Sequence, residues 1–165
     1  MFSNETLELA ETLIASLKEQ NKSIVTIESC TGGLVAAALT EVSGSSEVVY
    51  GGFITYANKA KTNMIGVPVA SLEQYGAVSE QVARAMAEGG LSASGTDIAI
   101  SITGVAGPTG GTQEKPVGLV HFACATKNNT YHLEMLFGEN LERGKIRQLS
   151  VNTILEMSLE VIGES

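Results

Sequence analysis

Residues 104–118 (GVAGPTGGTQEKPVG) hold five of the chain's 18 glycines and two of its three prolines. Glycine and proline disrupt both helices and strand interiors, so this segment is predicted to be one long loop. Ordinary connections take about four to six residues, and longer loops often carry function. No Gly-Lys-Ser/Thr follows, so the segment is not a P-loop. A flexible surface loop and a loop whose backbone amides line a ligand both fit this pattern.

The rest of the chain alternates between helical and strand patterns. Apolar residues at helical spacing predict helices over 5–20, 34–42, 79–91 and 141–162, with short helical turns from Asn58, expected as a cap, and from the capping box Ser71–Gln74. Short apolar or alternating runs predict strands over 23–28, 48–56, 97–103, 119–126 and 131–137. In the last strand one face is expected to be buried. The last two strands are separated only by Lys-Asn-Asn-Thr, which is typical of a hairpin.

This order predicts an α/β fold, a three-layer α/β/α sandwich with a mostly parallel, mixed sheet whose antiparallel strand comes from the hairpin. Ligands of such sheets bind beyond the carboxyl ends of the strands. The loops 29–33 and 104–118 both follow predicted strands, so both qualify as ligand-binding loops.

Composition narrows the class of protein. A length of 165 residues with 44% hydrophobic residues indicates one globular domain, residues 1–165. A net charge of −8 disfavours nucleic acid as a partner. The acidic N-terminus does not resemble a signal peptide, and no apolar run reaches the roughly 20 residues that cross a bilayer. Two cysteines and two histidines give neither a disulfide framework nor a metal site. We expect a cytoplasmic protein with no membrane partner.

Ser29 lies where a predicted strand turns into a helix, followed by Cys30 and small residues. The amides around such a helix start can hold an oxyanion or a phosphate. Serine is also among the commonest helix caps, and the pattern alone favours capping over catalysis. A nucleophilic serine needs a base, but His121 and His132 fall inside predicted strands without an obvious acidic partner. A Ser-His-Asp triad is therefore not supported.

Lysine offers another base. Tyr56 ends the second predicted strand, and Lys59 and Lys61 follow it. A lysine amine accepts a serine proton only if its pKa falls from about 10.4 toward neutrality. The pattern alone favours Lys59 and Lys61 as the exposed face of a short helix. The Tyr-x-x-x-Lys pair of short-chain dehydrogenases would need lysine at position 60, which is Ala60, and no glycine-rich dinucleotide fingerprint is present.

Arg143 and Arg147 lie one turn apart at the start of the last predicted helix. Their forked donors could grip a phosphate. A solvated face paired with Glu139 or Glu142 is the more common arrangement.

Five blocks of the sequence, in order, closely resemble the CinA carboxy-terminal domain family: 28–33 (ESCTGG), 55–61 (TYANKAK), 76–79 (GAVS), 101–108 (SITGVAGP) and 115–118 (KPVG). The characterised enzymes of this family are nicotinamide-nucleotide amidases. The resemblance implies a five-stranded mixed sheet, and hydrolysis of nicotinamide mononucleotide to nicotinic acid mononucleotide and ammonia without a cofactor or metal. It also implies a homodimer or larger homo-oligomer.

By the same resemblance, Ser29 matches the nucleophile, Lys61 the general base, and Tyr56 a third member that supports the pair. The residues expected to bind substrate are Cys30, Thr31, Gly32, Gly33, Asn58, Thr103, Gly104 and Arg143. The family pattern typically has Gly-Asp-Arg shortly after the last strand, whereas residues 137–143 (FGENLER) hold a few more, which affects the placement of Arg143. Family members often carry a larger amino-terminal domain, which we do not expect in a chain of 165 residues. The alternative function is a non-catalytic module that binds a nucleotide or a protein partner.

Overall fold

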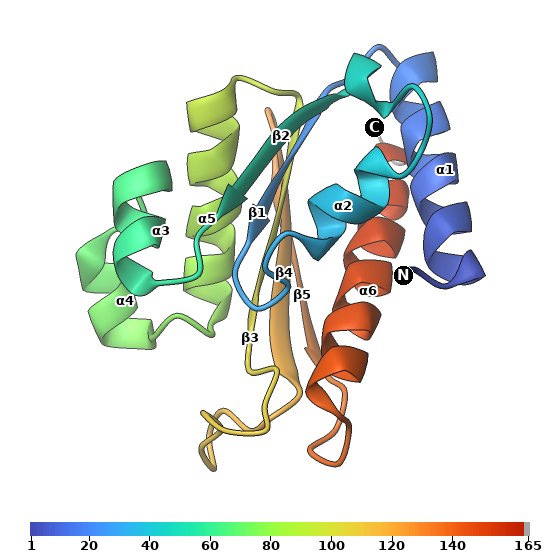
Figure 1. Ribbon diagram of the computed structural model, residues 1–165. Coiled ribbons are helices and arrows are strands. Elements are labelled where there is room, and N and C mark those ends of the chain that lie inside the picture. The colour runs from blue at the N-terminus through green and yellow to red at the C-terminus, as the bar shows by residue number, and fades with distance from the viewer. Residues whose placement is uncertain (164–165) are drawn as a thin grey trace.

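The computed structural model describes residues 1–163 as an alternation of helices and strands (Figure 1). In chain order these are α1 (Asn4–Glu19), β1 (Ile24–Glu28), α2 (Leu34–Thr40), the 3₁₀ turn η1 (Ser45–Glu47), β2 (Val49–Ile54), α3 (Asn58–Ile65), α4 (Val69–Tyr75), α5 (Glu80–Ser94), β3 (Ile98–Gly104), β4 (Leu119–Thr126), β5 (Thr130–Leu136) and α6 (Arg143–Gly163). Residues 105–118 contain no helix or strand, as their glycine and proline content predicts.

The five strands form one mixed sheet in the order β2-β1-β3-β4-β5. β1 pairs in parallel with β2 and β3, whereas β4 runs antiparallel to both β3 and β5. The hairpin thus supplies the one reversed strand, and the predicted α/β fold is confirmed. Because β1, β2 and β3 point the same way, the segments that leave their carboxyl ends meet at one edge of the sheet.

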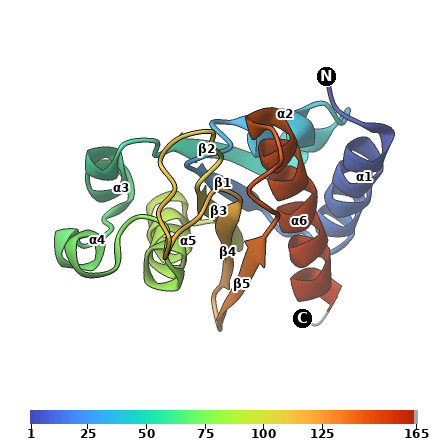
Figure 2. The ribbon, with the colours of Figure 1, turned by 90° about the horizontal axis from the view of Figure 1, so that it is seen from below.

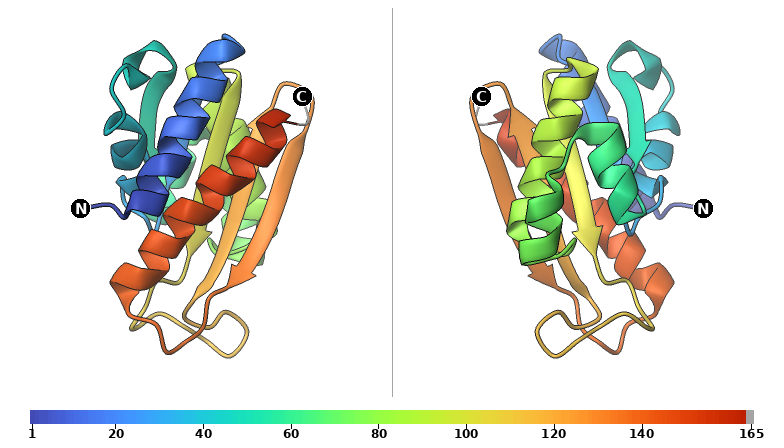
Figure 3. Two further views of the ribbon diagram at one scale, coloured as in Figure 1. Left: turned by 90° about the vertical axis from the view of Figure 1, so that its right-hand side faces the viewer. Right: turned by 90° about the vertical axis from the view of Figure 1, so that its left-hand side faces the viewer.

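Helices cover both faces of the sheet, with α1, α2 and α6 on one side and α3, α4 and α5 on the other (Figures 2 and 3). Alternate residues of β1 face opposite sides, since Ile24 packs with Leu13 of α1, whereas Val25 and Ile27 pack with Met86 of α5. The sheet therefore separates two apolar cores, one on each of its faces.

Two local predictions about helix starts are wrong. Ala57 is the residue before α3, so Asn58 is already helical and does not cap the helix. The capping box Ser71–Gln74 does not form, because α4 begins at Val69, directly after Pro68. The predicted helix over 79–91 is present as α5 and is capped by Ser79, whose hydroxyl accepts a hydrogen bond from the N–H of Val82.

The predicted buried face of the last strand is only partly buried. Tyr131, Met135 and Phe137 pack against the core beneath α6, but Leu133 is 36% exposed. β5 is the edge strand, so neighbouring elements cover less of it than of β4. Within the described residues, no helix is both long and apolar enough to cross a membrane.

Candidate active site

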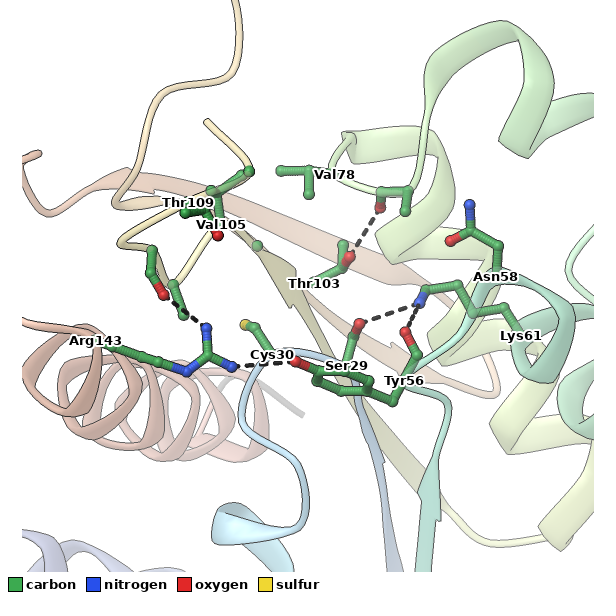
Figure 4. Close-up of a pocket in the computed structure, with 15 residues that line it drawn as sticks. Ser29, Cys30, Tyr56, Asn58, Lys61, Val78, Thr103, Val105, Thr109 and Arg143 are labelled. Carbon is green, nitrogen blue, oxygen red and sulfur yellow. Dashed lines mark hydrogen bonds between the residues drawn. The ribbon is translucent and has the colours of Figure 1, made fainter. Parts of the chain in front are cut away.

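A cavity of about 490 Å³ lies beyond the carboxyl ends of β1, β2 and β3 (Figure 4). Five separate segments line it. They contribute Ser29 and Cys30 after β1, Tyr56, Asn58 and Lys61 after β2, Ala77 and Val78 before α5, Thr103 and Gly104 at the end of β3 with Val105, Ala106, Gly107, Thr109 and Gly110 after it, and Arg143 of α6. Both predicted ligand-binding loops reach this cavity, and a volume of this size is typical of small-molecule sites.

Ser29 sits in a tight turn that connects β1 to α2. Its N–H donates to the carbonyl of Ile102 on β3, and its own carbonyl accepts from the N–H of Gly32. Gly32 and Gly33 have positive φ angles of 59° and 102°, which favour glycine and let the chain reverse sharply. The residue that caps α2 is Gly33, so the capping role considered for Ser29 is wrong and its hydroxyl is available for another partner.

The free N–H groups at the start of α2 are bound by the buried carboxylate of Glu28. Its two oxygens accept hydrogen bonds from the N–H groups of Gly33, Val35 and Ala36, at 3.0, 3.1 and 2.9 Å. A negative charge at this position complements the helix dipole. Because Glu28 fills the helix N-terminus, that terminus is not the anion site that the sequence suggested.

Lys61 points from α3 into the base of the cavity, although its side chain is only 1% exposed. Its Nζ lies 3.1 Å from Ser29 Oγ, 2.7 Å from the Thr55 carbonyl oxygen and 3.5 Å from that of Tyr56. A neutral amine has two N–H groups and one lone pair. With its N–H groups directed to the two carbonyls, its lone pair is left for the Ser29 hydroxyl.

The environment of Lys61 favours its neutral form. Burial lowers its pKa from 10.5 to about 8, because a desolvated ammonium is costly. Lys59, two residues earlier, is exposed. The two lysines were expected on one exposed face, and the structure separates them.

Cys30 is the other potential nucleophile in the cavity. Burial, assisted by the nearby negative charge of Glu28, raises the pKa of its thiol to about 11. At neutral pH the group is therefore a thiol, which is a much weaker nucleophile than a thiolate. Ser29, next to its amine, is the better candidate.

Arg143 and Tyr56 close one side of the cavity (Figure 4). The guanidinium of Arg143 donates to the carbonyl of Gly107 at 2.7 Å and to the hydroxyl of Tyr56 at 3.1 Å. The Tyr56 side chain is 61% exposed, and only its backbone carbonyl contacts Lys61. Its hydroxyl thus lies with Arg143 rather than with the Ser29–Lys61 pair.

The other predicted substrate-binding residues divide into two groups. Asn58, Thr103 and Gly104 line the cavity, with the Thr103 hydroxyl donating to the carbonyl of Ala77. Thr31, Gly32 and Gly33 do not line it and instead shape the turn.

The two histidines lie outside the cavity and contact each other. His121 Nδ1 and His132 Nε2 are 2.9 Å apart, with Glu134 and Glu80 at 3.8 and 3.7 Å from the outer ring nitrogens. Acidic neighbours are therefore present, contrary to the sequence expectation, but these come from β5 and α5. The described residues contain no group of three or more His, Cys, Asp or Glu side chains arranged to hold a metal ion.

Sequence reasoning did not identify several contributors to the site. Thr55 supplies the carbonyl nearest to Lys61, and Glu28 binds the free N–H groups at the start of α2. Val78 lines the cavity from the segment before α5. A carboxylate at the end of a buried strand was a signal for Glu28, whereas a backbone carbonyl leaves no signal in a side-chain pattern.

Comparisons with known proteins match this arrangement to one family. A family model described as the CinA C-terminal domain matches residues 6–162. A CinA-like protein of Synechococcus sp. (strain RCC307) is 48% identical over 149 residues, which are 90% of this chain and 36% of that protein. A CinA-like protein of Syntrophomonas wolfei is 47% identical over 156 residues, 94% of this chain and again 36% of the relative. The chain thus spans about a third of the length of these relatives.

Solved structures agree with these matches. The competence/damage inducible protein CihA from Agrobacterium tumefaciens is 47% identical, with a TM-score of 0.95 over 99% of this chain and 98% of that one. A competence-damaged protein (CinA) superfamily protein from Escherichia coli is 34% identical, with a TM-score of 0.90 over 98% and 94%. By sequence and by structure, the chain belongs to the CinA C-terminal domain family.

Proposed function

We propose that this domain is an amidohydrolase that converts nicotinamide mononucleotide to nicotinic acid mononucleotide and ammonia, with Ser29 as nucleophile and Lys61 as general base. The observation that carries the proposal is the 3.1 Å contact between Ser29 Oγ and the buried Nζ of Lys61, whose pKa is about 8. A base with a pKa near the working pH is well suited to proton transfer.

The proposed reaction has two stages. Neutral Lys61 takes the hydroxyl proton while Ser29 Oγ bonds to the carboxamide carbon, and the resulting ammonium gives that proton to the departing nitrogen. Ammonia leaves and an ester to Ser29 remains. A water molecule, deprotonated by Lys61, then attacks the ester, and the proton returns to Ser29 as the acid is released.

The backbone supplies a donor for the developing oxyanion. The amides that follow Ser29 are those of Cys30, Thr31 and Gly32. That of Gly32 donates to the Ser29 carbonyl, and Thr31 does not line the cavity. The N–H of Cys30 remains, directly after the nucleophile, which is a common source of an oxyanion donor.

Two further residues support a pyridine nucleotide as substrate. Arg143 has a planar guanidinium at the cavity edge that suits a phosphate group. The exposed ring of Tyr56 beside it suits a pyridinium cation, because aromatic faces attract positive charge. Substrate would compete with Tyr56 and Gly107 for the donors of Arg143.

Ammonia release from nicotinamide mononucleotide tests the proposal directly. We expect turnover by the wild-type chain and a loss of at least about 10³-fold in Ser29→Ala, because the nucleophile is absent. Cys30→Ala is the matched control and should retain turnover. An unchanged rate in Ser29→Ala, or complete loss in Cys30→Ala, would contradict the assignment.

The non-catalytic module remains a distinct outcome of the same assay. Binding of nicotinamide mononucleotide without ammonia release, at high protein concentration, would support that function. Turnover of other amides but not of nicotinamide mononucleotide would show that the substrate is a different amide. The Ser29–Lys61 mechanism would still apply.

A further inference from the structure

Arg147 lies one turn after Arg143 on α6 but has a different environment. Its Nε donates to the carbonyl of Cys30 at 3.1 Å, and its Nη2 donates to the carbonyl of Thr31 at 2.9 Å. It does not line the cavity, and its fork is directed at the turn that follows Ser29. The two arginines that the sequence offered as a phosphate grip therefore have separate targets.

The contact with Thr31 reaches Ser29 through one peptide group. The Thr31–Gly32 peptide has its carbonyl on Arg147 and its N–H on the carbonyl of Ser29. A trans peptide is planar, with its C=O and N–H pointing in opposite directions. Holding one end of this peptide with Arg147 therefore fixes the hydrogen bond at the other.

The same geometry continues into the next peptide. The carbonyl of Ser29 accepts from Gly32, so the N–H of Cys30, in the same peptide plane, is directed away from Gly32. This N–H is the oxyanion donor of the proposed reaction. The planar Thr31–Gly32 and Ser29–Cys30 peptide groups, joined by a hydrogen bond, thus connect the Arg147 guanidinium to the Cys30 N–H.

Glu28 holds the turn from the opposite side. Its carboxylate takes the N–H groups of Gly33, Val35 and Ala36, while Arg147 takes the carbonyls of Cys30 and Thr31. The Glu28 carboxylate thus binds N–H groups on one side of the turn, and the Arg147 guanidinium binds carbonyl groups on the other.

We propose that Arg147 is a positioning residue that orients the peptide groups after Ser29, and with them the oxyanion donor, without contacting substrate. This inference rests on the proposed function. It assigns different roles to two arginines one turn apart, with Arg143 at the substrate and Arg147 at the turn.

Steady-state kinetics of ammonia release separate the two roles. Arg147→Met keeps an unbranched, helix-compatible side chain and should lower kcat by about 100-fold with little change in KM, because a misoriented donor weakens only transition-state binding. Arg147→Lys, which retains one donor group, should recover part of kcat. Arg143→Met is the matched comparison and should mainly raise KM. An unchanged kcat in Arg147→Met, or a rise in KM alone, would overturn the proposal.

Two readouts separate failure of this inference from failure of the proposed function. Covalent labelling of Ser29 by phenylmethylsulfonyl fluoride, followed by intact mass, needs no nucleotide substrate and should slow in Arg147→Met. Hydrogen–deuterium exchange over residues 29–36 should accelerate in Arg147→Met but not in Arg143→Met. If the wild type releases no ammonia, equal exchange in wild type and Arg147→Met still overturns the positioning role.

Discussion

At the scale of single residues, the chemistry depends on what surrounds one amine. Lys61 has two backbone carbonyls and one serine hydroxyl as neighbours and almost no water. Among the described residues no carboxylate forms an ion pair with it, and burial lowers its pKa more than the electrostatic interaction with Cys30 raises it. A lysine in this setting changes protonation state close to neutral pH.

The rate of ammonia release should follow this titration. Because Lys61 must be neutral to accept a proton, kcat is expected to rise with pH through about 8 and then to level off. Measuring kcat between pH 6 and 10 reports the pKa of the base. A kcat that is flat, or that falls between pH 6.5 and 8, would contradict the role of Lys61.

The pH dependence of the free energy of unfolding should also reflect the lowered pKa of Lys61. Unfolding returns the pKa of Lys61 from about 8 to about 10.5, so the unfolded chain binds the extra proton between these values. The cost that buried Lys61 imposes on the free energy of unfolding is therefore absent above pH 10.5 and grows as the pH falls to about 8. Relative to Lys61→Met, the wild type should gain about 2 kcal/mol between pH 8 and 9.5, measured by urea denaturation. Equal pH dependence in both proteins would refute the shift.

The sequence identified Lys61 through family resemblance, whereas the residue pattern alone favoured an exposed lysine. One overlooked signal was present. Lys61 and Ile65 are four residues apart on α3, and both are buried, so they share the face that packs inward. Lys59 is not on that face. The pKa shift itself could not be predicted, because it depends on burial by segments distant in sequence.

At the scale of elements, α5 sets the distance between the helix that carries Lys61 and the strand that precedes Ser29. A Cβ on Gly89 would lie 1.9 Å from the carbonyl oxygen of Ile65, and one on Gly90 would lie 2.3 Å from the Ile27 side chain. The two glycines therefore let α5 approach α3 and β1 together. The predicted helix included them, but its periodicity gave no reason for glycine there.

Substituting Gly89 tests this close approach. Gly89→Ala should destabilise the fold by about 1–3 kcal/mol, because the methyl group meets rigid backbone rather than a movable side chain. It should also lower kcat by displacing α3. Urea denaturation and ammonia release measure the two effects.

Gly144→Ala is the control for the change in helix propensity. It lies in α6 with nothing within 4 Å of the new Cβ and should stabilise by up to about 1 kcal/mol. Similar effects of the two substitutions on stability would show that Gly89 has no packing role.

At the scale of the whole molecule, one end of the sheet carries the site while the two cores support it. The topology was predictable, because helix and strand periodicities and a four-residue hairpin connection leave few arrangements of one sheet. The full lining of the cavity was not, since it is assembled from five segments that are separated by many residues in the sequence. The family resemblance identified several of these residues, but it did not identify Val78 or the backbone carbonyls that Arg147 binds, which only the three-dimensional structure shows.

The core beneath α1 should affect stability without affecting chemistry. Leu13 is fully buried in that core, and α1 contributes no residue to the cavity. Leu13→Ala should cost about 2–5 kcal/mol by leaving a cavity, measured by urea denaturation. The rate of ammonia release per folded molecule should stay at the wild-type value. A fall in the rate per folded molecule would show that packing in the core beneath α1 affects the geometry of the cavity.

The order in which the cavity walls occur along the chain has a consequence during synthesis. The serine turn emerges early from the ribosome, but the arginines that border and clamp it belong to α6, the last helix. A nascent chain that lacks this helix has Ser29 and Lys61 but neither the arginine at the cavity edge nor the arginine that holds the turn. Under the proposed function, efficient catalysis would begin only after α6 has been translated and has packed, and enzymatic turnover would report on molecules in which this helix is in place.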